Sequence, residues 1–115
     1  MPVNSMLMTT TSSIEGQAIS RYLGVVAGEA AIAPIELRDF AAFIRREGAG
    51  RHPEFEKLVR ETRQVALLNL QTEAQELGAN GLIGIDFDYA YLASDGLVMI
   101  TVSGTAVLLA EKRPS

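Results

Sequence analysis

One pair of side chains in the sequence is spaced for joint chemistry, the carboxylates of Asp86 and Asp88. They lie in the segment Gly81–Tyr91, which alternates apolar and polar residues as a β-strand does. On a strand, residues two apart point to the same face, with their Cα atoms about 7 Å apart. Such a pair could bind one hard cation, which prefers oxygen ligands, or meet an arginine across an interface. The plainer interpretations are a polar sheet face or a structural salt bridge.

Other carboxylates could complete an oxygen cage around such an ion. Glu29 ends a glycine-rich strand and Glu15 lies in a flexible turn, so either could supply a further ligand. We take Asp86, Asp88 and Glu29 as the candidate metal ligands. His52 is the only histidine, and the chain has no cysteine, so one subunit cannot build a structural zinc site. A ring of subunits could still gather several copies of His52.

Several kinds of chemistry lack the residues they need. Without cysteine there can be no disulfide, thiolate nucleophile or thiolate metal site. Nothing places a His/Asp pair around Ser12, Ser13 or Ser103, so triad catalysis has little support. Gly24 and Gly28 lie inside a predicted strand and lack the lysine and helix of a phosphate loop. We therefore expect a protein that is not an enzyme.

Length and composition bound the remaining classes. The 115 residues make one domain, and 48% of them are hydrophobic, which is rich for a lone small domain. The net charge of −4 disfavours nucleic-acid binding. No run approaches the ~20 apolar residues of a membrane span, and residues 1–8 do not resemble a signal peptide. We expect a cytoplasmic protein that binds neither nucleic acid nor membrane.

The chain divides into a flexible leader at 1–6, one domain at 7–110 and a polar tail at 111–115. Within the domain, alternation and turn residues predict four strands, at Leu7–Thr11, Arg21–Ala31, Gly81–Tyr91 and Leu97–Ala110. Helical spacing predicts a short helix at Pro34–Glu47 and a long one that begins at Pro53 and ends at Gly78. The turn Ser94-Asp95-Gly96 should join the last two strands as an antiparallel hairpin.

Side-chain patterns place the faces of these elements. The long helix should bury one apolar stripe, made of Phe55, Leu58, Val59, Thr62, Val65, Ala66, Leu70, Ala74 and Leu77. The third strand should put its apolar residues on one face, namely Ile83, Ile85, Phe87, Tyr89 and Tyr91, with Gly84, Asp86 and Asp88 on the other. Glycines at 24 and 28 suggest that a helix, a neighbouring subunit or a ligand comes close there.

These elements predict an α+β domain, a small antiparallel sheet packed against two helices. The helices can cover only one face of the sheet. The other face also carries apolar residues of the last strand, such as Val98, Ile100 and Val102 or their alternates. Leaving them exposed would cost about 25 cal/mol per Å² of apolar area, so a partner subunit is the simplest cover. We therefore expect a homo-oligomer.

The chain resembles the YbjQ-like proteins, described as putative heavy-metal-binding. The resemblance runs from about Leu7 to Val107, and five segments carry it in order: Tyr22–Glu29, Arg45 with Gly50-Arg51, Leu77–Asn80, Gly84–Tyr89 and Gly104–Val107. It implies a dodecin-like α+β subunit that assembles into a closed ring, typically a pentamer, and it implies no established reaction.

The resemblance also sharpens the choice of function. Some relatives carry a cysteine suited to a soft ligand, and this chain has none. Thiol-based heavy-metal binding is therefore not expected here. Two hypotheses remain: a metal-ion or small-ligand binding module, with a divalent cation as the only cofactor considered, or a scaffold ring with no ligand.

Overall fold

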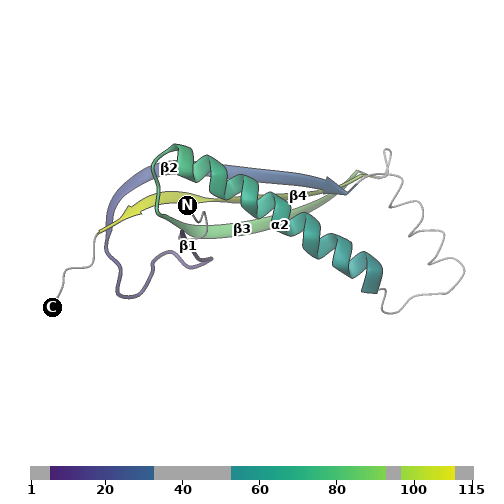
Figure 1. Cartoon of the computed structure of the whole chain (residues 1–115), viewed down its shortest axis with the longest axis horizontal. Coiled ribbons are helices and arrows are strands. Elements are labelled where there is room, and N and C mark those ends of the chain that lie inside the picture. The colour runs from purple at the N-terminus through teal and green to yellow at the C-terminus, as the bar shows by residue number, and fades with distance from the viewer. Residues whose placement is uncertain (1–5, 33–52, 93–96, 111–115) are drawn as a thin grey trace, which may run out of the picture.

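The computed structural model describes residues 6–32, 53–92 and 97–110. Its elements are β1 (Leu7–Met8), β2 (Ile19–Ile32), α2 (Pro53–Glu76), β3 (Gly81–Leu92) and β4 (Leu97–Leu109). The four strands form one sheet in the order β1-β3-β4-β2, and α2 crosses one of its faces (Figure 1). The α+β class is confirmed, while the helix predicted at 34–47 and the turn at 94–96 lie outside the described residues.

The sheet is mixed, which corrects the prediction of an antiparallel sheet. β4 pairs antiparallel with both β3 and β2, and the predicted pairing of the last two strands is confirmed. β1 instead runs parallel to β3, with Leu7 opposite Gly81 and Met8 opposite Leu82. A strand of two residues has no periodicity from which its direction could be predicted.

The main core lies between α2 and the sheet. Its fully or almost fully buried members are Val26, Ala66, Leu70, Ala74, Leu82, Ile100, Val102 and Ala106. Gly28 marks the closest approach, because a Cβ added there would lie 2.5 Å from the backbone nitrogen of Leu70. The sequence analysis expected a helix, a neighbouring subunit or a ligand close to Gly24 and Gly28. At Gly28 the close neighbour is the helix α2.

The buried stripe of α2 is narrower than its sequence predicts. Thr62, Ala66, Leu70 and Ala74 are buried, whereas Val65 is 51% exposed and Leu77 is 46% exposed. Successive helical residues are about 100° apart, so Val65 cannot lie against the sheet when Ala66 faces it squarely. The assignment of Val65 and Leu77 to the buried stripe was wrong, and the side chain of Phe55 lies outside the described part of the chain. Met6, assigned to the flexible leader, is also buried in the main core, at 8% exposure.

A β-bulge in β3 changes which residues share a face. The register with β4 shifts between Ile83 and Asp86, and Gly84 adopts a positive φ of 62°. Leu82 and Ile85 therefore belong to the core under α2, while Ile83 joins a second cluster that includes Val107 and Leu109. The prediction that Ile83 shares a face with Ile85 was wrong, because strict alternation fails across a bulge.

The end of α2 follows the predicted chemistry. Gly78 adopts the left-handed conformation, with φ of 85°, and its amide donates to the carbonyl of Gln75. Two residues on, the Asn80 side-chain oxygen accepts a hydrogen bond of 2.7 Å from the amide of Leu109. This bond ties the start of β3 to the end of β4. Within the described residues, no helix has the length and apolar character needed to cross a membrane.

Candidate functional site

The middle of the sheet surface opposite α2 is lined with oxygen-bearing side chains. In the register of the strands, Asp88 lies opposite Thr101, and Thr101 lies opposite Glu29. In the next row Asp86 lies opposite Ser103. Opposed residues in a sheet point to the same face. We call this surface the open face and define it by Ala27, Glu29, Asp86, Asp88, Thr101 and Ser103.

The two aspartates are where the sequence placed them. Phe87, between them, packs against the core under α2, so Asp86 and Asp88 both point away from it. Both are exposed, while Thr101 and Ser103 on the central strand are half-buried. Each carboxylate therefore has a hydroxyl residue directly across, with Cβ atoms about 5 Å apart.

Glu29 lies on the open face, but it is not an immediate neighbour of the two aspartates. It lies on β2, and β4 separates β2 from β3. Two strand spacings amount to about 10 Å, too far for Glu29 and Asp88 to bind one ion without a change in geometry. Accordingly, no three carboxylate or histidine side chains of the described residues converge into a metal-binding group.

The backbone around Glu29 is fixed by α2. β2 is an edge strand, and two side chains of the helix satisfy its outward-facing backbone groups. Asn69 donates to the carbonyl of Glu29 at 3.0 Å, and Glu73 accepts from the amide of Ala27 at 3.4 Å. These bonds cover the edge where another strand would add. The exposed Glu29 side chain thus projects from an anchored strand.

The hydroxyls were the part of the site that the sequence analysis missed. Ser103 was considered only as a catalytic nucleophile, and Thr101 was not considered as a ligand. A signal was present, since the two residues alternate with Ile100, Val102 and Gly104 along the predicted strand. Their neighbours, however, depend on the register between strands. Of the other candidates, Glu15 is exposed in the turn before β2, and His52 lies outside the described residues.

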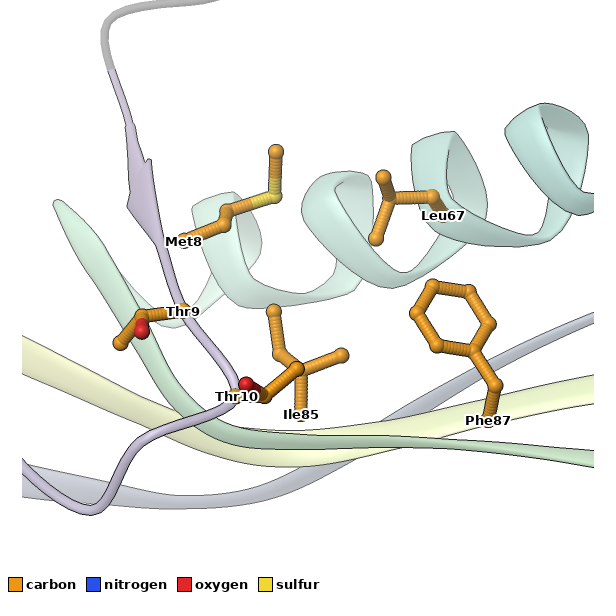
Figure 2. Close-up of a pocket in the computed structure, with 6 residues that line it drawn as sticks. All are labelled: Met8, Thr9, Thr10, Leu67, Ile85 and Phe87. Carbon is orange, nitrogen blue, oxygen red and sulfur yellow. The ribbon is translucent and has the colours of Figure 1, made fainter.

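The other face of the sheet has a hollow of a different kind. It measures about 260 Å³ and is lined by Met8, Thr9, Thr10, Leu67, Ile85 and Phe87. Figure 2 shows Met8, Leu67, Ile85 and Phe87 around this space, between α2 and the N-terminal segment. The lining has two threonine hydroxyls and no carboxylate or histidine. It lacks charged oxygen ligands for a cation, so the open face remains the candidate site.

Two comparisons with known proteins bear on this arrangement. The YbjQ family model, described as "putative heavy-metal-binding", matches residues 6–110 of the chain. A solved structure from Pediococcus pentosaceus, a protein of unknown function in the DUF74 family, has a similar fold with a TM-score of 0.56. The alignment covers 91% of this chain and 98% of that one at 20% identity. At this identity the structural likeness supports the fold alone.

Proposed function

The chain belongs to the YbjQ-like family, and we propose that it is a homo-oligomeric binding module whose open face holds a divalent cation. The observation that carries the proposal is the arrangement of Asp86 and Asp88 on one exposed face, with Ser103 and Thr101 directly across from them. The module acts in the cytoplasm and catalyses no reaction.

The ligand chemistry favours a hard cation. Asp86 and Asp88 contribute carboxylate oxygens, and the neighbouring hydroxyls of Ser103 and Thr101 add neutral oxygens. Ca²⁺ takes six to eight oxygen ligands, so water fills much of the coordination shell and the affinity is weak. Glu29 reaches the ion only through a water molecule, since β4 lies between the two carboxylate-bearing strands.

Soft metal ions fit this chain poorly despite the family's description. Hg²⁺ and Cd²⁺ prefer thiolate ligands, and the chain contains no cysteine. The open face offers hard oxygen ligands instead. This chain should therefore bind hard cations, although its family is described as binding heavy metals.

Assembly into a closed ring, as the family resemblance implies, is the second part of the proposal, with five subunits as the expected number. The apolar content of 48% and exposed large side chains support it, including Val25 at 81% and Tyr22 at 68% exposure. Where such side chains form a contiguous patch, the patch marks an interface. A ring also repeats the open face once in each subunit.

Calorimetry with Ca²⁺, Mg²⁺ and Cd²⁺ tests the cation site. We expect Ca²⁺ or Mg²⁺ binding that disappears in the Asp86→Asn/Asp88→Asn variant and weakens only a few-fold in Glu29→Gln. Glu61→Gln removes an exposed carboxylate of α2, on the other side of the sheet from the open face, and serves as the matched control. Hard-ion binding that survives in the double variant would exclude these aspartates as ligands. Sub-micromolar Cd²⁺ binding would contradict the argument from the missing thiolates.

A scaffold ring without ligand is the alternative function. It is favoured by the lack, within the described residues, of a convergent three-ligand group. Native mass spectrometry with added divalent cations separates the two functions. Stoichiometric retention of a cation on the oligomer supports the binding module, and an oligomer that stays empty supports the scaffold. A monomer of 12.4 kDa at micromolar concentration would rule out the assembly common to both.

A further inference from the structure

The side of α2 that faces away from the sheet carries two large apolar residues with no cover. Val65 is 51% exposed and Leu68 is 54% exposed. They belong to a line of exposed residues three or four positions apart, which therefore share one side of the helix. We call this line the outer stripe; its members are Lys57, Glu61, Val65, Leu68, Thr72 and Glu76.

The outer stripe is complementary to itself when it is turned end over end. The intervals between its six members are 4, 4, 3, 4 and 4 residues, the same in both directions. In an antiparallel pair of such helices, Val65 of each copy meets Leu68 of the other at the centre. Lys57 meets Glu76 of the other copy at both ends, so opposite charges face each other. Glu61 then faces the neutral Thr72.

We infer that two copies of this chain associate through the outer stripes of their α2 helices, in antiparallel orientation around a two-fold axis. The same patch serves on both subunits, which makes the contact isologous. It goes beyond the proposed cation site, because the open face lies on the other side of the sheet. It also differs from the contacts of a cyclic ring of five, which must be heterologous. The stripe therefore joins two rings, or two subunits if no ring forms.

The charges at the two ends of the stripe fix the orientation. Lys57 and Glu76 both have exposed side chains. A parallel arrangement would bring Lys57 against Lys57 and Glu76 against Glu76, which like-charge repulsion disfavours. A pair of helices buries less than the ~1,200 Å² of a standard interface, so the association is weak and depends on concentration.

Charge reversal provides the decisive test. Lys57 and Glu76 are about 28 Å apart along one helix, so they cannot interact within a subunit. We expect Lys57→Glu alone and Glu76→Lys alone each to weaken association about ten-fold, measured by sedimentation equilibrium. The double variant Lys57→Glu/Glu76→Lys should restore it to within about two-fold, because the reversed charges again face each other. Failure of the double variant to recover would overturn the inference.

Neither reversal should weaken the helix appreciably, although Lys57→Glu puts a second carboxylate four residues before Glu61. Glu near the N-terminus of a helix and Lys near its C-terminus both match the helix dipole better than the native residues do. Loss of association in the single variants therefore reports the contact between copies. The expected change is a halving of the mass, from paired rings to single rings or from dimer to monomer. A ring that falls apart into subunits would assign these charges to the ring contact and overturn the inference.

The apolar centre of the stripe has a matched control in the same chain. Leu68→Gln should weaken association about ten-fold, whereas Leu77→Gln should leave it unchanged, although both leucines are about half exposed. Equal effects of the two substitutions would overturn the inference. Because the chain has no cysteine, mixing the single variants Val65→Cys and Leu68→Cys adds a direct readout, since neither copy can form a disulfide on its own. Oxidation should cross-link two copies, and the absence of a disulfide-linked dimer would count against the antiparallel pairing.

Discussion

The face of the sheet under α2 and the open face on its other side are built from the same strands but from different residues. Under α2, Val26, Ile100 and Val102 are at most 2% exposed. On the open face, Glu29 and Asp88 are exposed, with Thr101 half-buried between them. Alternation along each strand produces both faces at once, since successive side chains point in opposite directions.

The difference between the faces separates stability from binding. Burial of apolar side chains under α2 supplies the free energy that holds the helix on the sheet. The open face contributes little to this core, so its side chains are free to serve a ligand. Substitutions at neighbouring positions of one strand should therefore have very different consequences.

The largest expected effect comes from Gly28, where the strand touches the helix backbone. Gly28→Val puts a side chain into the space held by Ala66 and Leu70 and should lower the free energy of unfolding by about 4 kcal/mol or more. The control is Ala27→Val, which places the same final side chain on the exposed open face and should change stability by about 0.5 kcal/mol or less. Urea denaturation of both variants measures the difference. Similar losses would mean that the two faces are packed alike.

Two leucines of α2 test the same contrast from the helix side. Leu70 is fully buried and Leu68 is 54% exposed. Leu70→Ala should cost about 3 kcal/mol, because it leaves a cavity beneath the helix. Leu68→Ala should cost well under 1 kcal/mol when unfolding is followed at high dilution, where copies do not associate. A large loss at Leu68 would place the buried side of α2 elsewhere.

A smaller effect is expected where α2 secures the edge of the strand that carries Glu29. Asn69→Ala removes the hydrogen bond to the Glu29 carbonyl and should cost about 1 kcal/mol. Gln64→Ala removes an exposed amide elsewhere on the same helix and should be close to neutral. Thermal denaturation of the two variants, together with faster amide exchange around Glu29 in Asn69→Ala, checks this. Unchanged exchange would show that the bond does not hold the edge.

The smallest change in stability is expected on the open face itself. Asp86→Asn/Asp88→Asn should alter the free energy of unfolding by about 0.5 kcal/mol or less without added cation, because both side chains are exposed and outside the core. In the presence of Ca²⁺, only the wild type should gain stability, through preferential binding to the folded state. A marked destabilisation of the double variant without cation would instead indicate a structural role for these aspartates.

Element positions were predictable wherever local chemistry is strong. The predicted start of α2 at Pro53 matches the structure, and Gly78 takes the predicted left-handed conformation after the helix ends at Glu76. The strands β2, β3 and β4 lie within two residues of their predicted bounds. The direction of β1 was not predictable, because Leu7 and Met8 alone carry no pattern. The assignment of Ile83 failed for a related reason, since the bulge at Gly84 interrupts the alternation.

Only the two aspartates of the candidate site could be predicted from the sequence; the hydroxyl residues across from them could not. Asp86 and Asp88 share a face because they are two residues apart in one strand, a relation local to the sequence. Their pairing with Ser103 and Thr101 depends on the register between β3 and β4, and the bulge shifts that register. The separation of Glu29 from the aspartates depends on the strand order, which places β4 between β2 and β3.

By itself, the sequence determined which residues can serve as ligands, which cannot, and how side chains alternate along each element. These properties depend on residue type and on the fixed periods of helix and strand. Tertiary structure decided what each face meets: Gly28 receives the helix backbone, Val65 faces outward, and Glu29 is held apart from Asp88. The physical reason is that packing and strand register join residues distant in the chain, and no local period encodes such contacts.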